Sequence, residues 1–340
     1  MEKVQYTDIS EGNNRSLTKR WLFLLAFLAI LPWIFKVTNY SDYLTYIVVR
    51  IMILGLYAMS YDLIFGYTGM LSFGQASFLG GGAYTVAIMM RHLHLPIHDA
   101  ILPILAALVI GVMIGWIQGF LSSKLGQLAV FIVTFAITET IFLLIIADPL
   151  KITNSEDGIS GLQRETVLGF LNIKPELNFY YFVLILLCLS YLVLRLIVHL
   201  PFGDTIQAIR ENPQRARFLG YQVSHYRIAT FMISGFFAAL AGALMALHER
   251  SVGPEVFGVF VSADAFFYTV LGGPGTLIGP VLGAALVLIA TEILSDIFRN
   301  WLIFFGLSYI ALIMFLPKGL FPLLEKLLAR QPRLNRKESS

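Results

Sequence analysis

Long apolar runs separated by short polar stretches fill most of this chain. Each run is continuous rather than alternating, and a membrane-spanning helix needs about 20 apolar residues. Strands that span a membrane would instead give alternating segments of about ten residues. The pattern therefore predicts an all-α polytopic protein with about ten transmembrane helices, at residues 21–38, 44–64, 72–90, 100–121, 128–147, 179–200, 227–248, 255–271, 277–295 and 299–316.

Composition supports an integral membrane protein with a single transmembrane domain. Of the 340 residues, 57% are hydrophobic and 13% are charged, whereas soluble domains carry about 25% charged residues. The transmembrane domain is expected at residues 21–316, after a leader at 1–20 and before a basic tail at 317–340. Cys188 is the only cysteine, so an intrachain disulfide and a cysteine-based metal site are both excluded.

Basic residues indicate how the chain is oriented. Lysine and arginine gather in the leader, in a central loop at 201–226 and in the tail, and with ten helices these three segments lie on the same side of the membrane. The positive-inside rule makes that side cytoplasmic, so both termini are expected there. The loop at 148–178 then lies outside, and it carries five acids against three bases. We expect a bacterial cytoplasmic membrane protein and no nucleic-acid partner.

The central loop contains the stretch AIRENPQRARFLG, residues 208–220. Asp204 is predicted to cap a first short helix, and Asn212 a second helix that begins at Pro213. Gly220 suits a left-handed stop. Two short helices joined at an angle fit a groove on a cytoplasmic partner, with apolar sides formed by Ala208, Ile209, Ala216, Phe218 and Leu219. The capping pattern favours docking over a loop that only fixes topology.

Three stretches of the chain resemble one transporter family. DTIQAIRENPQRARFLGYQVSHYRIATFMISGFFAALAGAL resembles the cytoplasmic coupling segment of LivM-type branched-chain amino acid permeases of ABC importers. The similarity extends to FGYTGMLSFGQASFLGGGAY (65–84) and LGGPGTLIGPVLGA (271–284). In that family the segment seats in a nucleotide-binding subunit. The resemblance implies an ATPase contact made by Ala208, Arg210, Glu211, Asn212, Pro213, Arg215, Ala216 and Gly220.

The resemblance also implies partners and a class of substrate. It implies two cytoplasmic ATP-binding subunits, a second related permease that completes a heterodimer, and an extracytoplasmic substrate-binding protein. Its substrates are mostly leucine, isoleucine and valine, with urea, short amides and other amino acids in related permeases. A phosphate-binding P-loop needs G-x-x-x-x-G-K-[ST], and the nearest glycine-rich stretch, GGPGTLIGP, lacks the lysine. No cofactor is therefore expected in this chain, and ATP and magnesium belong to the partners.

The two glycine-rich stretches are predicted to interrupt membrane helices. Irregular backbone inside a membrane is tolerated where it faces protein or a water-filled cavity, and paired interruptions indicate a transport pathway. Polar residues accompany these glycines, which favours the pathway over helix packing, the role expected for Gly111, Gly115 and Gly119. The predicted pathway residues are Gly69, Ser72, Gly74, Gln75, Glu139, Asp264, Gly273, Gly275 and Thr276.

Ionisable residues within the apolar runs usually find partners or face inward. Glu139 is the deepest; it could meet substrate, pair with an arginine or donate a hydrogen bond when protonated, and structural pairing is favoured. Arg50 and Asp62 are expected to reach the surface from the ends of the second helix. A cluster of three histidines in a short outer loop, His92, His94 and His98, lacks further ligands, so no metal site is predicted.

Two other classes of function are open at this point. In a self-sufficient secondary transporter, Glu139 or Asp264 would carry protons and the stretch at 208–220 would be a topology loop only. A membrane enzyme would need a nucleophile with its base or a cluster of metal ligands, and the sequence offers neither at the membrane surface. The favoured hypothesis is the ABC importer permease, which is not itself an enzyme, with a urea or short-amide permease of the same family as its alternative.

Overall fold

A computed structural model describes residues 31–33, 41–92, 99–164, 166–167, 169, 171–297 and 306. The predicted leader and basic tail lie outside the described residues, as do nearly all of the predicted helices at 21–38 and 299–316. The remaining eight predicted helices correspond to α2 (Ser41–Asp62), α3 (Gln75–His92), α4 (Ile101–Ser122), α5 (Gln127–Ala147), α6 (Glu176–His199), α9 (Val223–Glu249), α10 (Val259–Gly272) and α11 (Ile278–Ile297).

Five of the described helices are long and apolar enough to cross a membrane: Asp42–Tyr67, Ile101–Ser122, Gln127–Ala147, Glu176–His199 and Val223–Glu249. The prediction of a helical membrane protein is therefore confirmed, although the described fold also has short strands. The count of ten crossings stays a prediction. The predicted helix at 255–271 is different in form. It consists of a short 3-10 turn, η3 (Pro254–Phe257), followed by α10. With 14 residues, α10 is about 21 Å long, shorter than a hydrocarbon core of about 30 Å.

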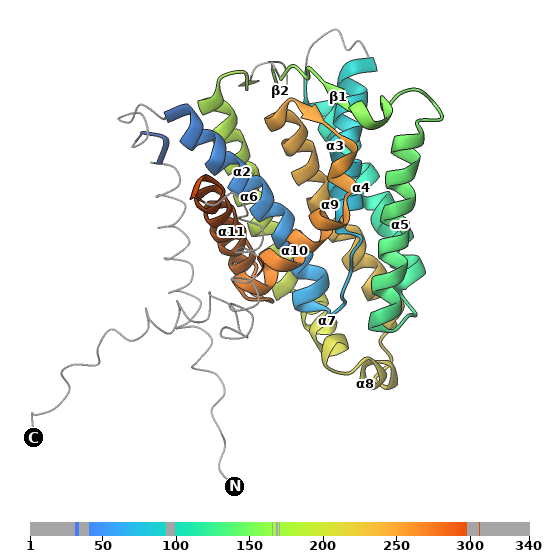
Figure 1. The fold of residues 1–340 in the computed structure, drawn as a ribbon. Coiled ribbons are helices and arrows are strands. Elements are labelled where there is room, and N and C mark those ends of the chain that lie inside the picture. The colour runs from blue at the N-terminus through green and yellow to red at the C-terminus, as the bar shows by residue number, and fades with distance from the viewer. Residues whose placement is uncertain are drawn as a thin grey trace, which may run out of the picture.

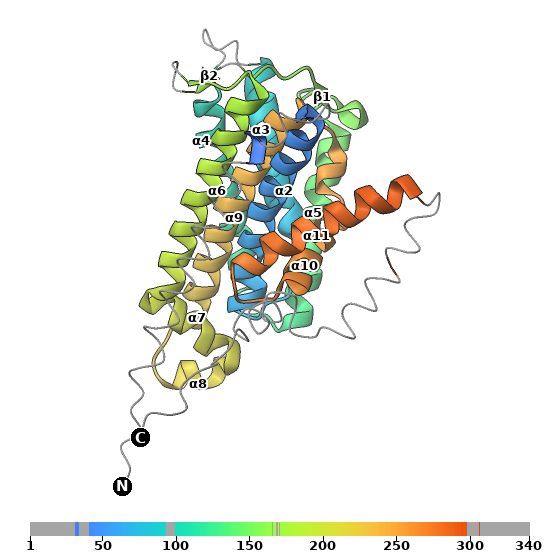
Figure 2. The same cartoon turned by 90° about the vertical axis from the view of Figure 1, so that its left-hand side faces the viewer.

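The long helices form a bundle whose two ends differ (Figure 1). One end carries the short helices α7 (Pro201–Glu211) and α8 (Pro213–Phe218), and we call it the coupling end. The opposite end, the loop end, carries η2 (Ser155–Asp157) and two small antiparallel sheets. In these sheets β1 (Ile159–Ser160) pairs with β4 (Ser251–Val252), and β2 (Thr166–Val167) pairs with β3 (Leu171–Asn172). Figure 2 shows α11 inclined across α2.

Close packing of small residues holds α3, α4 and α9 together. A Cβ atom added to Gly111 or Gly115 would collide with the backbone of Gly235 or Phe231 on α9, and one added to Gly119 would lie 2.9 Å from Ile228 Cα. The predicted packing role of the three α4 glycines is therefore confirmed. Because glycine has no side chain, the backbones of α4 and α9 come into direct contact at these positions.

The first glycine-rich stretch interrupts the helices only in part. After Asp62 the chain continues as a π-helix, η1 (Leu63–Tyr67), and Gly69 then takes a left-handed conformation with φ of 68°. Irregular backbone continues to the start of α3 at Gln75. The later glycines of this stretch, at 80–82, lie inside α3, where Gly82 packs against the backbone of Ala239. They are packing residues, so the prediction of an interruption was wrong for that part.

Candidate functional site

Two short helices form the predicted coupling segment at 201–226. The Asn212 side-chain oxygen accepts hydrogen bonds from the backbone N–H groups of Gln214 (3.1 Å) and Arg215 (2.9 Å), and Pro213 begins α8. Gly220 is left-handed, with φ of 91°. These three predictions are confirmed. The predicted cap at Asp204 was wrong, because α7 begins at Pro201, a residue well suited to the first helical position, and Asp204 lies inside the first turn.

The apolar residues of the coupling segment divide into two groups. Ile209 and Ala216 are buried and form a small core with Val223. By contrast, Phe218 and Leu219 are 90% and 72% exposed. Ala216 therefore fixes the angle between the helices and offers no surface to a partner, which corrects its predicted position in a contact. The surface that the segment does present includes Phe218 and Leu219. The predicted contact residues that are exposed on it are Ala208, Arg210, Glu211, Asn212, Arg215 and Gly220.

Arg210 points back toward the membrane helices rather than only outward. Its guanidinium donates a hydrogen bond to the carbonyl oxygen of Gly66 in η1. Its aliphatic stem lies against Gly69, where an added Cβ would stand 2.8 Å from Arg210 Cγ. The carbonyl of Gly69 in turn accepts a bond of 2.9 Å from the Gln127 side chain. The coupling segment is thus attached to the first glycine-rich stretch.

Asp62 attaches that same stretch to the second one. It is completely buried, and its carboxyl oxygens accept hydrogen bonds from the backbone N–H groups of Gly275 (2.7 Å) and Leu277 (2.9 Å). The prediction that Asp62 reaches the surface was wrong. The loop folds with positive φ at Gly273 (113°), Gly275 (79°) and Leu277 (59°), which turns two of its N–H groups toward the carboxyl group. We call Asp62, Gly66, Arg210, Gly275 and Leu277 the Asp62 junction.

Predicted pathway residues of the first stretch are bonded to protein groups. The Gln75 side chain donates to Ser60 Oγ at 2.7 Å, and both residues are completely buried. Ser72 Oγ accepts a bond of 3.1 Å from the N–H of Gly74. The Gly74 carbonyl accepts a bond of 3.2 Å from Gln118 on α4. These polar groups join α2, α3 and α4, and their place in a translocation pathway stays a prediction.

The remaining predicted pathway residues lie apart from this group. Thr276 stabilises its own turn, since Oγ1 donates to the Gly273 carbonyl (2.7 Å) and accepts from the Gly279 N–H (3.0 Å). Glu139 on α5 and Asp264 on α10 are each half-buried. Within the described ranges Glu139 has no hydrogen-bond or ion-pair partner, so the pairing favoured for it is not found there.

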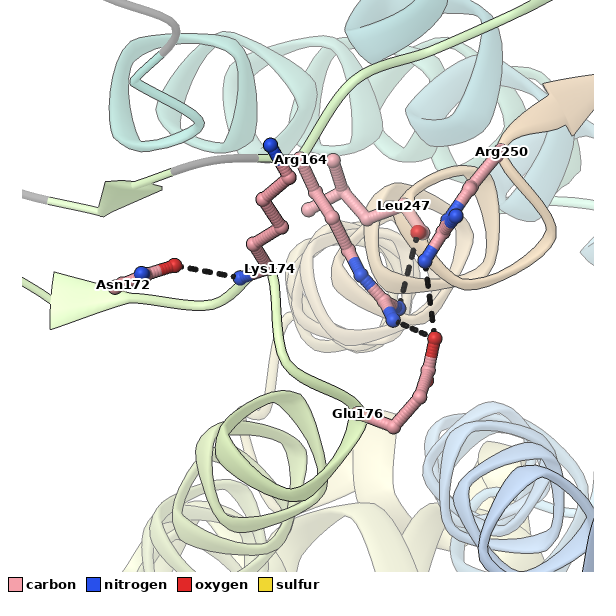
Figure 3. A network of polar contacts seen from close by, with 6 residues as sticks. All are labelled: Arg164, Asn172, Lys174, Glu176, Leu247 and Arg250. Carbon is pink, nitrogen blue, oxygen red and sulfur yellow. Dashed lines mark hydrogen bonds and ion pairs between the residues drawn. The ribbon is translucent and has the colours of Figure 1, made fainter. Parts of the chain in front are cut away.

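The loop end holds a charged network that the sequence did not reveal (Figure 3). The Arg164 guanidinium forms an ion pair with Glu176, donates to the Leu247 carbonyl at 3.4 Å, and lies 4.1 Å from the ring centre of Phe179. Arg250 donates to the same Glu176 oxygen at 3.0 Å. Burial lowers the pKa of Arg164, although the adjacent Glu176 opposes that shift. Segments far apart in sequence meet here, which local patterns cannot predict.

Most of the chain matches one family of known proteins. Residues 43–316 match the family described as "Branched-chain amino acid transport system / permease component". The chain belongs to this family. The permease is 29% identical, over 91% of its length and 76% of the relative's, to the high-affinity branched-chain amino acid transport system permease protein LivM of Salmonella typhimurium. It is 28% identical to the LivM protein of Escherichia coli over the same shares.

More distant relatives carry other names. Over 64% of its length, the permease is 27% identical to the ribose import permease protein RbsC of Haemophilus influenzae, of which 66% is covered. No solved structure matches the permease significantly. The resemblance drawn from the sequence motifs is thus confirmed: this is a membrane-embedded permease of the ABC transporter class, a transporter subunit rather than an enzyme.

The matched residues include the coupling segment and both glycine-rich stretches, so the permease family shares the region that builds the Asp62 junction. The histidines of the outer loop lie mostly outside the described residues. His92 ends α3, whereas His94 and His98 lie outside the described residues. In the part of the permease that the structure describes, no three histidine, cysteine, aspartate or glutamate side chains are grouped so that they could hold a metal ion.

Proposed function

We propose that this permease imports branched-chain amino acids across a bacterial cytoplasmic membrane, driven by separate ATPase subunits. The observation that carries the proposal is the folded elbow of α7 and α8, which projects at one end of the bundle with Phe218 and Leu219 exposed. Large apolar side chains that project from a short capped helix fit a groove on a protein partner. Family membership and the LivM relatives support this reading.

In this proposal the elbow and both termini are cytoplasmic. Two ATP-binding subunits hold ATP and magnesium, and one of them receives α8, with Phe218 and Leu219 in its groove and Arg215 at the edge of the contact. The loop at 148–178 faces outward and receives an extracytoplasmic substrate-binding protein. A second, related permease completes a heterodimer.

The substrate proposed is leucine, isoleucine or valine. The two glycine-rich stretches contain no acidic or basic residue, and a solute without net charge needs no fixed counter-charge on its route. Urea or a short amide would satisfy the same condition, and ribose is a third solute to test, because a ribose import permease is among the relatives.

Uptake by the reconstituted complex tests the proposal. Proteoliposomes would contain the permease, its partner permease and the ATPase subunits, with the binding protein outside. We expect uptake of labelled leucine that requires internal ATP and that excess isoleucine or valine inhibits. Leucine uptake by the permease alone under a proton gradient would overturn the proposal in favour of a secondary transporter. ATP-driven uptake of urea or ribose with no leucine uptake would overturn the substrate assignment.

A double substitution tests the docking surface. Phe218→Ser with Leu219→Ser is expected to abolish copurification with the ATPase subunits and to leave the thermal stability of the permease almost unchanged, because both side chains are exposed. Leu171→Ser at the loop end is the matched control, since Leu171 is also exposed. Normal copurification of the double variant would place the ATPase elsewhere.

A further inference from the structure

Three segments that are distant in the sequence meet at the Asp62 junction. The end of α2 and η1 supply Asp62 and Gly66, α7 supplies Arg210, and the loop between α10 and α11 supplies Gly275 and Leu277. A side chain accounts for each connection: Arg210 binds the Gly66 carbonyl, and Asp62 binds two N–H groups of the loop. The junction therefore lies between the surface proposed to meet the ATPase and both glycine-rich stretches.

Packing is tight where Asp62 and Arg210 meet η1 and the residues that follow it. A Cβ added to Gly66 would collide with the Asp62 carboxyl oxygen and with the backbone nitrogen of Gly275. Beside it, the Arg210 stem fills the space that a side chain at Gly69 would occupy. Because close-packed groups transmit displacement better than loosely packed ones, we expect a shift of α7 to move η1, and a shift of η1 to move the loop at 273–277.

Both side chains bind backbone groups, and this fixes what the junction can transmit. Arg210 holds a carbonyl and Asp62 holds N–H groups, so a displacement carried by either side chain acts directly on the main chain of the stretch that it binds. Hydrogen bonds that involve charged groups are about twice as strong as neutral ones. Asp62 and Leu277 are buried, so the Leu277 N–H group would find no water to replace the carboxyl group if it lost this acceptor.

We propose that Asp62 and Arg210 are the positioning residues that pass movement of the coupling segment to the two glycine-rich stretches. Arg210 delivers movement of α7 to η1, and Asp62 carries it on to the loop at 273–277. This inference rests on the proposed function, because it presumes that an ATPase moves α7. It assigns Arg210 a role within the permease, where the resemblance implied a contact with the ATPase, and it assigns Asp62 a role in transport.

The test uses the complete reconstituted complex and three measurements: copurification of the ATPase, ATP hydrolysis stimulated by the binding protein, and leucine taken up per ATP hydrolysed. For Arg210→Ala and Asp62→Asn we expect an assembled complex that hydrolyses ATP but takes up about tenfold less leucine per ATP, the size of a typical coupling between sites. Arg210→Lys should recover part of the loss, because an ammonium group can still donate to the Gly66 carbonyl.

Controls separate this role from folding and docking. Arg91→Ala removes an exposed arginine at the far end of α3 and should leave all three measurements unchanged. Unaltered uptake per ATP in Arg210→Ala would overturn the inference, as would a loss of copurification that accounts for the whole loss of uptake. If Asp62→Asn does not fold, the comparison of Arg210→Ala with Arg210→Lys decides alone. Failure of the proposed function is recognised separately, because the wild-type complex would then show no ATP-driven leucine uptake.

Discussion

The two ends of the bundle are held by different kinds of polar contact. At the loop end, Arg164 and Arg250 share the Glu176 carboxylate, so charged side chains bind one another. At the coupling end, Asp62 and Arg210 bind backbone groups of the glycine-rich stretches. The loop end therefore depends on which charges are present, whereas the coupling end depends on the shape of the backbone. The first arrangement suits a fixed attachment, and the second suits a part that must move as a unit.

Burial also differs within the loop-end network. The Arg164 side chain is 1% exposed, the Glu176 side chain 39% and the Arg250 side chain 53%. Water can replace a lost partner only for the exposed groups, so substitutions in this one network should differ widely in their effect.

The largest effect on stability is expected for Glu176→Ala. It leaves the buried Arg164 guanidinium without its carboxylate and should lower the free energy of unfolding by about 2 to 3 kcal/mol, less than for a wholly buried pair because Glu176 is partly exposed. Thermal unfolding in detergent measures the change. Glu156→Ala, an exposed acid in η2, is the control and should change little. Equal stability of the two variants would mean that the loop end is not held by charge.

A smaller effect on stability is expected for Gly275→Ala. The position has room for a methyl group, since the nearest atoms lie 3.6 and 3.8 Å from an added Cβ, but its φ of 79° costs an L-residue about 1 to 2 kcal/mol. Gly161→Ala at the loop end is a close match, with the same φ of 79° and open space around it. Both variants should lose similar stability, whereas only Gly275→Ala should reduce leucine uptake per ATP. Equal leucine uptake per ATP in the two variants would mean that the coupling end has no greater role in transport than the loop end.

The smallest effect is expected for Arg250→Gln. Its ion pair with Glu176 is exposed, and such pairs contribute about 0.2 to 1 kcal/mol. Arg164 keeps its ion pair in this variant, so thermal stability should remain close to that of the wild type at both low and high salt. A loss of stability as large as that of Glu176→Ala would show that the exposure of a side chain does not determine how much it contributes to this network.

Local chemistry made much of the fold predictable. Continuous apolar runs gave the long helices, the small residues of α4 gave its packing, and Asn212 with Gly220 gave the limits of α8, because each depends on neighbours in sequence. The prediction of a helix cap at Asp204 was wrong because Pro201 begins the helix three residues earlier. The packing of Ala216 was missed because its contact with Val223 depends on how α8 turns back on α9.

The junction could not be predicted for a related reason. Gly275 and Leu277 lie 213 and 215 positions after Asp62, and only the fold brings their N–H groups to the carboxyl group. From sequence alone, an acid at the end of an apolar run is more simply placed at the membrane surface. Likewise, Arg164 is one of several charges in a polar loop, and nothing around it in the sequence marks it as buried.

The contact of α3 and α4 with α9 limits where a solute can travel. Backbone atoms of Gly82 and Ala239, and those of Gly111 and Gly235, already touch. The proposed substrate, an amino acid with a branched side chain, would have no passage along these two contacts unless the helices separate. In this arrangement a route for the proposed solute would follow other faces of the bundle, beside these three close-packed helices.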